Sequence, residues 1–480
     1  MKFIRLIIYQ CLIAFVLVFG ISGCTKLVTV SSPATSVTDA SVYSADATAI
    51  AVLTGLYIQL SQTQYFSPGG LPTLSEYAGL SADELTLWSG ANNPNSLAYY
   101  TNTLSVSAGG TEYWGLNYGN IYTCNAAIEG LTSSTTLTPS VKQQLLGESK
   151  FMRAFYYFYL VNLYGDLAVP LTTNYTSNEN LPRASIAEVY MQIIADLKDA
   201  QNLLGSDFLD ATLLNQSPQR IRPTKWAATA LLARAYLYSG NWAGADSAAS
   251  SVIGNAQFSL TSLDSVFLAN SSETIWSLQP VTTGITNTQD GELFILPSSG
   301  PNSAIPNPVY LSNGLLDNFE TGDQRRINWV DSVTVGTDTF YYPFKYKVNA
   351  QDTAVVEYLM MLRLGEQFLI RAEAEAEGAG NGLSAAIADL NVIRNRAGLN
   401  NTTASTQADI LAAILHERQV ELFTELGQRW FDLKRTKAID AVMNLACSVK
   451  GTTWNTNQQL YPLPLLDIQE DPKLTQNPGY

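Results

Sequence analysis

Three glutamates at helical spacing form the most conspicuous group of ionisable side chains in the sequence. Glu417, Glu421 and Glu425 repeat every four residues, which places them on one face of a helix. Neighbouring like charges at this spacing cost about 0.2–0.5 kcal/mol each, so something must offset them. Arginines able to do so fall in helices expected to stack nearby: Arg371, Arg394, Arg396 and Arg429. We interpret the glutamates as part of a structural ion network.

The side chains needed for nucleophilic or metal-assisted catalysis are scarce. His416 is the only histidine, and we expect it to be structural or solvent-facing. Cys11 lies in the N-terminal leader and Cys24 at its end, which leaves Cys124 and Cys447. This set assembles neither a Ser-His-Asp or Cys-His centre nor a zinc cluster, so we predict no catalytic residue, metal or cofactor. Glycoside hydrolysis needs only two carboxylates and stays open as an alternative.

The two remaining cysteines are far apart in sequence. Cys124 and Cys447 could pair in an oxidising compartment, but a chain of 480 residues needs no such staple. We favour two unpaired, buried thiols.

Composition and charge narrow the class of protein. The chain is 46% hydrophobic, which is ample for a sizeable core. Its formal charge is −14, and it becomes −16 when Lys2 and Arg5 are removed with the leader. Such an acidic balance argues against nucleic-acid partners and against electrostatic binding to anionic lipid.

Residues 1–23 are typical of an export leader. Lys2 and Arg5 precede an apolar run that is too short to span a membrane. The run closes on ISGC at residues 21–24, which is similar to a bacterial lipobox, and we predict lipidation of Cys24. Two or more acyl chains anchor a protein stably to a membrane. The Ser/Thr-rich residues 24–40 are expected to form a flexible tether.

The stretch Gly147–Pro170 predicts the central element of the fold. Half of the residues from Phe151 to Tyr164 are aromatic, and they fall on every side of a helix. A helix that is apolar all round must be buried among other helices. Gly165 and Pro170 mark its end.

Most of the remaining chain predicts helices that pair and stack. Expected helices cover residues 40–62, 110–130, 141–163 and 186–204, the last opened by a capping box at Ser185 and Glu188. Lys225–Ile253 and Arg363–Arg396 each read as a tetratricopeptide-like helix pair, and a last helix is expected over Asp409–Leu433. Because such pairs have apolar faces that they cannot bury alone, the pairs must stack. We predict an all-α, tetratricopeptide-like helical superhelix, forming a single domain over residues 41–480.

Two loop-rich inserts interrupt the helical pattern, at about residues 65–111 and 254–356. The second contains one expected strand, Thr274–Leu278. Long irregular segments are usually functional, so these inserts form the candidate binding face. Candidate ligand-binding residues there are aromatic or amide side chains, with Trp88 as first choice: Trp88, Asn92, Tyr65, Tyr310, Trp329 and Tyr341. Asp83 and Glu84 precede Trp88 and could bind a sugar hydroxyl or a cation, although no EF-hand spacing surrounds them.

The chain resembles the SusD/RagB family of outer-membrane nutrient-binding lipoproteins over nearly its whole mature length. Seven ordered segments carry the resemblance, and together they are very specific, whereas any one alone is weak. They are GESKFMRAFYYFYLVNLYGD (147–166), PRASIAEVYMQIIADL (182–197), RPTKWAATALLARAYLYSGNWAGA (222–245), LRLGEQFLIRAEAEA (362–376), LNVIRNRAG (390–398), ERQVELFTELGQRWFDLKR (417–435) and YPLPLLDI…LTQNPGY (461–480).

The resemblance implies a function as well as a helical-repeat fold. It implies a non-catalytic outer-membrane lipoprotein that captures oligosaccharides and delivers them to a TonB-dependent transporter of the SusC-like kind. It also implies display on the cell surface, although TKLVTV follows Cys24 where surface-displayed relatives often carry acidic residues. A peptide-binding receptor of the same family and a surface glycosidase are the alternatives.

Overall fold

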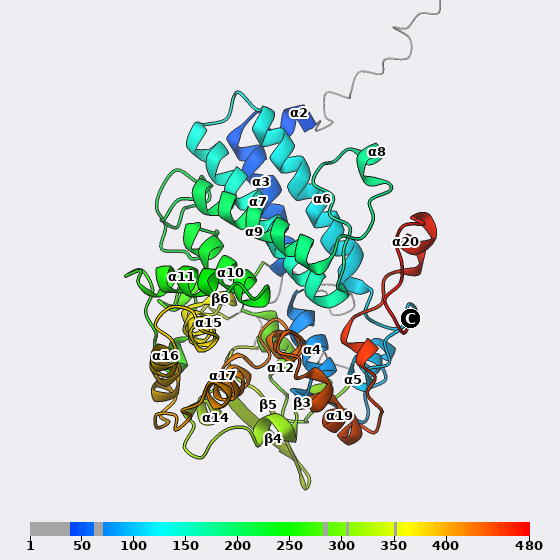
Figure 1. Ribbon diagram of the computed structural model, residues 1–480, viewed down its shortest axis with the longest axis vertical. Coiled ribbons are helices and arrows are strands. Elements are labelled where there is room, and N and C mark those ends of the chain that lie inside the picture. The colour runs from blue at the N-terminus through cyan, green and yellow to red at the C-terminus, as the bar shows by residue number, and fades with distance from the viewer. Residues whose placement is uncertain (1–38, 62–70, 282–286, 304–306, 350–352) are drawn as a thin grey trace, which may run out of the picture. The chain divides into compact units, whose positions relative to one another are not determined.

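The computed structural model describes residues 39–61, 71–281, 287–303, 307–349 and 353–480 (Figure 1). It divides into two compact units, Met1–Val42 and Tyr43–Tyr480. In the first, only the short helix α2 (Asp39–Val42) is described. The predictions that fall on the leader, on Cys24 and on Tyr65 therefore lie outside the described residues. Everything below concerns the second unit.

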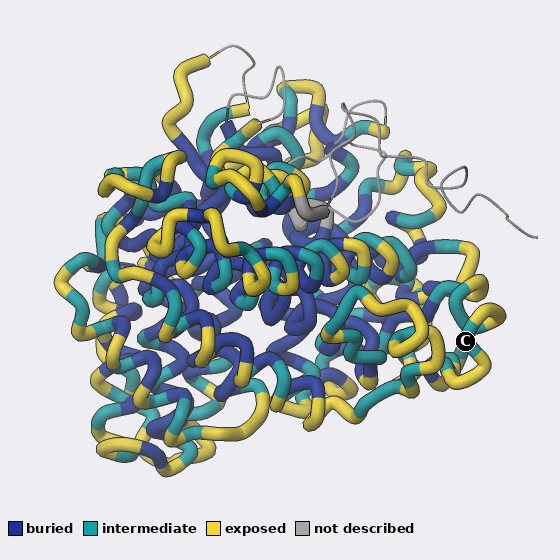
Figure 2. The backbone as a smooth tube through the Cα atoms, turned by 90° about the horizontal axis from the view of Figure 1, so that it is seen from above, coloured by how far each residue is buried: buried dark blue, intermediate teal, exposed yellow. Residues whose placement is uncertain are grey.

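Stacked helix pairs make up the framework of this unit, which confirms the all-α, tetratricopeptide-like prediction. The main helices pack one on the next in the order α6, α7, α9, α10, α11 and α15. Two later helices, α16 and α17, pack on α15, and the first long helix, α3, packs on α6 and α7. Their bounds are α3 Asp46–Ser61, α6 Glu112–Ser133, α7 Pro139–Tyr164, α9 Ile186–Leu203, α10 Lys225–Tyr238, α11 Trp242–Ile253, α15 Leu364–Ala376, α16 Leu383–Arg396 and α17 Gln407–Leu422. Figure 2 shows the buried residues gathered in the interior and the exposed ones on the outer turns.

The aromatic helix α7 is buried as expected. It begins with Pro139 in its first turn and ends at Gly165, whose φ of 76° is costly for residues with a Cβ. The Phe155 ring is fully buried between Tyr159, at 4.8 Å between ring centroids, and Trp276, at 5.4 Å. The predicted capping box at Ser185 is present at the start of α9.

The expected helix over Asp409–Leu433 is wrong, because the chain breaks between α17 and α18 (Gln428–Arg435). Thr424, Leu426 and Gly427 have φ values of 53°, 52° and 76°, and left-handed residues cannot continue a right-handed helix. Tertiary hydrogen bonds hold this break: the Leu426 amide donates to Ser75 Oγ over 3.1 Å, and the Thr424 amide donates to Glu84 over 3.4 Å. A further helix that the sequence did not suggest, α19 (Ile439–Val449), follows.

The two inserts contain more regular structure than the sequence predicts. Together with β6, which follows the second insert, their strands form three two-stranded antiparallel ladders, β1–β3, β2–β6 and β4–β5. The strand bounds are β1 Leu85–Leu87, β2 Thr274–Leu278 (as predicted), β3 Val309–Leu311, β4 Val330–Val335, β5 Asp338–Pro343 and β6 Leu359–Arg363. The shorter helices are α4 Leu71–Ser81, α5 Pro94–Thr101, α8 Tyr175–Asn178, α12 Gln289–Phe294, α13 Asn313–Leu316, α14 Gln324–Asn328 and α20 Leu465–Glu470. Most of these elements are too short to show a periodic pattern.

One further sequence expectation can be compared with the described residues. Cys124 and Cys447 are both buried and unpaired, which confirms the prediction of free thiols. Within the described ranges, no helix combines the length and apolarity that crossing a membrane requires.

Candidate functional site

The β1–β3 ladder brings Trp88 and Tyr310 to one face. Thr86 pairs with Tyr310 in the antiparallel register, and the Trp88 amide continues the pairing by donating to the Pro308 carbonyl over 2.8 Å. Side chains alternate between the two faces of a strand, so Thr86, Trp88 and Tyr310 share a face. Leucine and valine side chains of both strands are buried on the other face.

Two more aromatic rings adjoin this pair. The Phe340 ring of β5 packs edge-on against Tyr310, with 5.1 Å between ring centroids. Burial raises the pKa of Tyr100 in α5, with Tyr310 adding to the shift and a hydrogen bond with Thr86 opposing it. Trp88, Tyr100, Tyr310 and Phe340 are each half-buried, and we call these four residues the aromatic face.

A tight turn fixes the orientation of Trp88. The Ala91 amide donates to the Trp88 carbonyl over 2.9 Å, and the indole folds back onto Gly90. A Cβ at residue 90 would overlap the six-membered ring of Trp88, so a larger residue there would displace the indole. Asn92, one residue beyond this turn, is exposed. The small size of Gly90 therefore lets the indole lie against this turn.

The structure corrects the expectation that Trp329 lies on an accessible surface. Its side chain is fully buried, and its Nε1 donates to the Leu263 carbonyl over 3.0 Å. Phe267 packs edge-on against the indole, and the Lys345 ammonium lies 5.0 Å from its centroid. A short segment that looks loop-like in sequence is here part of the core.

Tyr341 lies apart from the aromatic face. It follows Phe340 in β5, so the two side chains point to opposite faces of the β4–β5 hairpin. The Arg326 guanidinium lies 4.5 Å from the centroid of the Tyr341 ring. Sequence reasoning thus placed two members of the aromatic face correctly together, Trp88 and Tyr310, and missed Tyr100 and Phe340. A Gly336-Thr337 turn between two Val/Thr/Tyr-rich runs was the available hairpin signal.

Asp83 and Glu84, which precede Trp88 in the chain, are held within the protein and are not available to a ligand. Asp83 accepts two hydrogen bonds from Arg429, at 2.8 and 2.7 Å. Glu84 is buried, and one of its oxygens has no hydrogen-bond partner. Burial raises the pKa of Glu84 to about 8, and Asp83 adds to the shift. A carboxyl group that is protonated at neutral pH avoids a buried charge directly before β1.

We expect Glu84 to make the protein less stable at alkaline pH. Its folded pKa of about 8 lies above its ordinary value of 4.5, so stability falls as pH rises through this window, by up to about 1.4 kcal/mol per pH unit. Glu84→Gln should therefore melt at nearly the same temperature as wild type at pH 4, below the ordinary pKa of the carboxyl group, and clearly above it at pH 9. Exposed Glu470 is the control, and Glu470→Gln should follow wild type at both pH values. Parallel pH curves for wild type and Glu84→Gln would contradict the assignment.

The three glutamates of α17 and the following break form a buried ion network, as predicted. Glu421 contacts Arg363 at 2.7 Å, Arg325 at 2.9 Å, and also Arg396. The remaining contacts are Glu417–Arg325 (2.6 Å), Glu417–Arg394 (3.3 Å), Glu425–Arg363 (2.8 Å) and Glu425–Lys345 (2.5 Å). Two of the four arginines expected to take part, Arg371 and Arg429, instead pair with Asp389 and Asp83.

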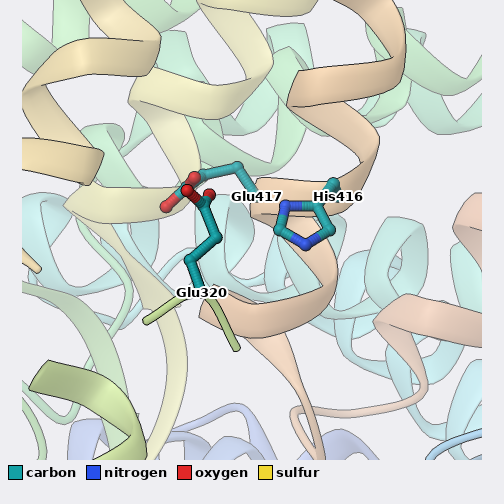
Figure 3. Close-up of side chains that lie close together, drawn as sticks. All are labelled: Glu320, His416 and Glu417. Atoms are coloured by element: carbon teal, nitrogen blue, oxygen red, sulfur yellow. The ribbon is translucent and has the colours of Figure 1, made fainter. Parts of the chain in front are cut away.

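Among the described residues, one cluster has the composition of a metal site. Donor atoms of Glu320, His416 and Glu417 all lie within 4.8 Å of one another (Figure 3). Arg394 already bonds both Glu320 oxygens, at 2.5 and 3.0 Å, and holds the pKa of Glu320 below its usual value. His416 Nε2 lies 2.9 Å from the Asn318 carbonyl. Because arginine charges neutralise both carboxylates, we assign this cluster to the ion network.

A separate concave surface lies along α3. It encloses about 700 Å³ between α3, residues 209–222 and the end of β2. Its lining is mostly aliphatic, from side chains such as Ile50, Ile58, Leu209 and Ile221. None of the candidate ligand-binding residues that the structure describes lines it.

Two family models match the chain. Residues 50–237 match one described as SusD-like, starch-binding and associating with the outer membrane, and residues 318–480 match that of the SusD family. Among curated proteins, SusD-like protein P2 of Formosa agariphila is 26% identical over 426 residues, covering 77% of this chain and 80% of that protein. The starch-binding protein SusD of Bacteroides thetaiotaomicron is 23% identical over 435 residues, covering 73% and 74%.

Solved structures agree with the fold. A SusD superfamily protein from Bacteroides vulgatus superposes with a TM-score of 0.75 at 19% identity, covering 91% of this chain and 100% of that one. A laminarin-binding SusD-like protein superposes with a TM-score of 0.72 at 23% identity, covering 90% and 99%. Both family matches, the curated relatives and the fold point to one assignment. The chain belongs to the SusD/RagB family.

Proposed function

We propose that the protein is a non-catalytic outer-membrane lipoprotein that captures oligosaccharides on the aromatic face and delivers them to a TonB-dependent transporter. The observation that carries the ligand class is the juxtaposition of half-buried Trp88 and Tyr310 on one face of the β1–β3 ladder. Relatives and neighbours named as starch-binding, laminarin-binding and surface glycan-binding proteins support a carbohydrate ligand. Lipidation of Cys24 and the transporter partner rest on the lipobox-like ISGC and on family membership.

Stacking on aromatic rings suits a sugar ligand energetically. A net hydrogen bond to a sugar hydroxyl contributes only about 0.5–1.5 kcal/mol, since water is displaced to form it. A sugar ring that buries on the order of 100 Å² of apolar surface adds about 2.5 kcal/mol. Two or three stacked rings, less the cost of association, predict dissociation constants between micromolar and millimolar. Asn92, exposed beyond the Trp88 turn, would contact ring hydroxyls.

Trp88→Ala is expected to weaken glycan binding at least tenfold and to change the melting temperature by only a few degrees. The reason is that the indole is half-buried and supplies stacking area rather than core packing. Affinity electrophoresis of the purified protein against a panel of soluble polysaccharides, followed by calorimetry on the best ligand, measures the effect. Tyr175→Ala, which truncates an exposed ring on α8, is the control and should bind normally.

Three outcomes would overturn the proposal. Unchanged binding with a lower melting temperature would make Trp88 a packing residue. Binding to peptides and to no polysaccharide would favour the peptide-receptor alternative. Release of shorter products from an oligosaccharide would favour the glycosidase.

A further inference from the structure

Arg326 differs from the other arginines of this protein. Within the described ranges it is the one arginine whose side chain forms neither an ion pair nor a hydrogen bond with another residue. All the others donate to carboxylates, amide oxygens or backbone carbonyls, and most are deeply buried. The chain has a formal charge of −14 and therefore many acidic side chains, yet none of those described pairs with Arg326.

The side chain of Arg326 is nevertheless held in place. Arg326 lies in α14, directly before β4, and its guanidinium stacks 4.5 Å from the centroid of the Tyr341 ring in β5. Both residues are half-buried. Stacking on an aromatic ring engages the flat face of a guanidinium and leaves the N–H groups at its edge free. Those donors form the fork that binds a carboxylate or a sulfate through two parallel hydrogen bonds.

Hydroxyl side chains lie on the same face of the hairpin as Tyr341. Ser332 pairs with Tyr341, and Thr334 pairs with Thr339, so these four side chains share one face. Ser332, Thr334 and Thr339 are exposed, and the two threonine hydroxyls lie 3.0 Å apart. We call Arg326 and these four residues the outer hairpin face. It offers a stacked cation beside a row of hydroxyls, which suits a polar ligand that carries a negative charge.

The acidic residues closest in sequence, Asp323 and Asp331, do not pair with Arg326. Asp323 is bonded to Arg325, at 2.8 and 3.0 Å. Asp331 is paired with Tyr342 on the opposite face of the hairpin and accepts a hydrogen bond from the Tyr342 hydroxyl over 3.1 Å. The guanidinium edge is therefore open to an acceptor from outside the chain.

We propose that the outer hairpin face is a second glycan subsite, in which Arg326, stacked on Tyr341, binds an oxyanion substituent of the sugar. The substituent is a uronate carboxylate or a sulfate ester, because both present two oxygens in the geometry that the guanidinium fork matches. The inference rests on the proposed function, since it adds charge recognition to a glycan-binding protein. It concerns a surface distinct from the aromatic face, because Tyr341 and Phe340 point to opposite sides of the hairpin.

The test compares charged and neutralised forms of the same polymer. The probes are polygalacturonate and its methyl ester, and a sulfated galactan and its desulfated form. Affinity electrophoresis and calorimetry at low and high salt measure binding to wild type, Arg326→Gln, Arg326→Lys and Lys437→Gln. Lys437 is exposed and lies after α18, so its substitution removes the same charge from another surface.

Wild type should bind the charged member of one pair at least tenfold more tightly than its neutral form. Arg326→Gln should abolish that ratio, Arg326→Lys should retain part of it, and Lys437→Gln should leave it unchanged. High salt should reduce the ratio, because exposed charge pairs are screened. Which pair shows the preference distinguishes the uronate from the sulfate.

The inference is wrong if wild type prefers neither charged polymer, or if Arg326→Gln keeps the preference with an unchanged melting curve. Failure of the proposed function has a different signature. In that case Trp88→Ala would leave the binding of neutral glycans unchanged, or no glycan would bind at all.

Discussion

Glu421→Ala is expected to abolish soluble expression or to lower the free energy of unfolding by at least about 3–5 kcal/mol. The Glu421 carboxylate is fully buried and contacts three arginines, Arg325, Arg363 and Arg396. Removing one partner of a buried ion pair leaves uncompensated charge in the interior, and here one excess positive charge would be shared among three buried arginines. Because total stability is only about 5–15 kcal/mol, the loss is large. Soluble yield and urea denaturation measure it.

Glu320→Gln is the matched control. Glu320 belongs to the same network, but its side chain is 42% exposed, so the cost should stay within about 1 kcal/mol. An unchanged urea midpoint for Glu421→Ala would contradict the role that we assign to the network.

A second variant, Glu421→Gln, tests the charge without emptying the site. Burial alone would raise the pKa of Glu421, but Arg396, Arg363 and Arg325 hold it well below its ordinary value of 4.5. The stability that this depressed pKa contributes is present above about pH 4.5 and is lost as the pH falls. Glu421→Gln should therefore be less stable than wild type at pH 7 and should lose less additional stability in acid.

Phe155→Ala is expected to cost about 3–5 kcal/mol of stability. The ring is fully buried in α7 and packs against Tyr159 and against Trp276 of β2, so its removal loses apolar burial and leaves a cavity. Thermal and urea unfolding should both show the change. Tyr122→Ala, which truncates a 57% exposed ring on neighbouring α6, should change stability by no more than about 0.5 kcal/mol. Equal melting curves for Phe155→Ala and wild type would place this ring outside the core.

Long helices could be predicted from the sequence because their signals are local. The aromatic run of α7, the small residues of the α10–α11 pair and the Ser185 capping box each act within one or two turns. The break between α17 and α18 could not be predicted in this way. It depends on hydrogen bonds that the Leu426 and Thr424 amides donate to Ser75 and Glu84, more than 300 residues earlier in the chain.

The residues of the candidate site likewise divide into those that neighbouring residues indicate and those that long-range contacts position. Trp88 stood out because it is the only Trp in the sequence between Tyr65 and Thr111, outside the predicted helices, and because short polar residues follow it, so its position could be anticipated from neighbouring residues. Its partner Tyr310 is positioned by pairing with Thr86, a register that only the folded chain sets. The prediction that Trp329 lies on an accessible surface was wrong because contacts with distant residues bury this side chain. A five-residue helix and a strand bury it against Phe267 and Lys345, and neither contact leaves a local signal.

The alternation along β5 constrains how this protein can diverge. Phe340 faces the aromatic side and Tyr341 the outer hairpin face, so inserting one residue within the strand would exchange the two surfaces at once. Lengthening the hairpin at Gly336, where added atoms meet no neighbour, would leave both surfaces intact. Lineages can therefore lengthen the hairpin at its tip, whereas an insertion of odd length between Asp338 and Pro343 would exchange its two surfaces.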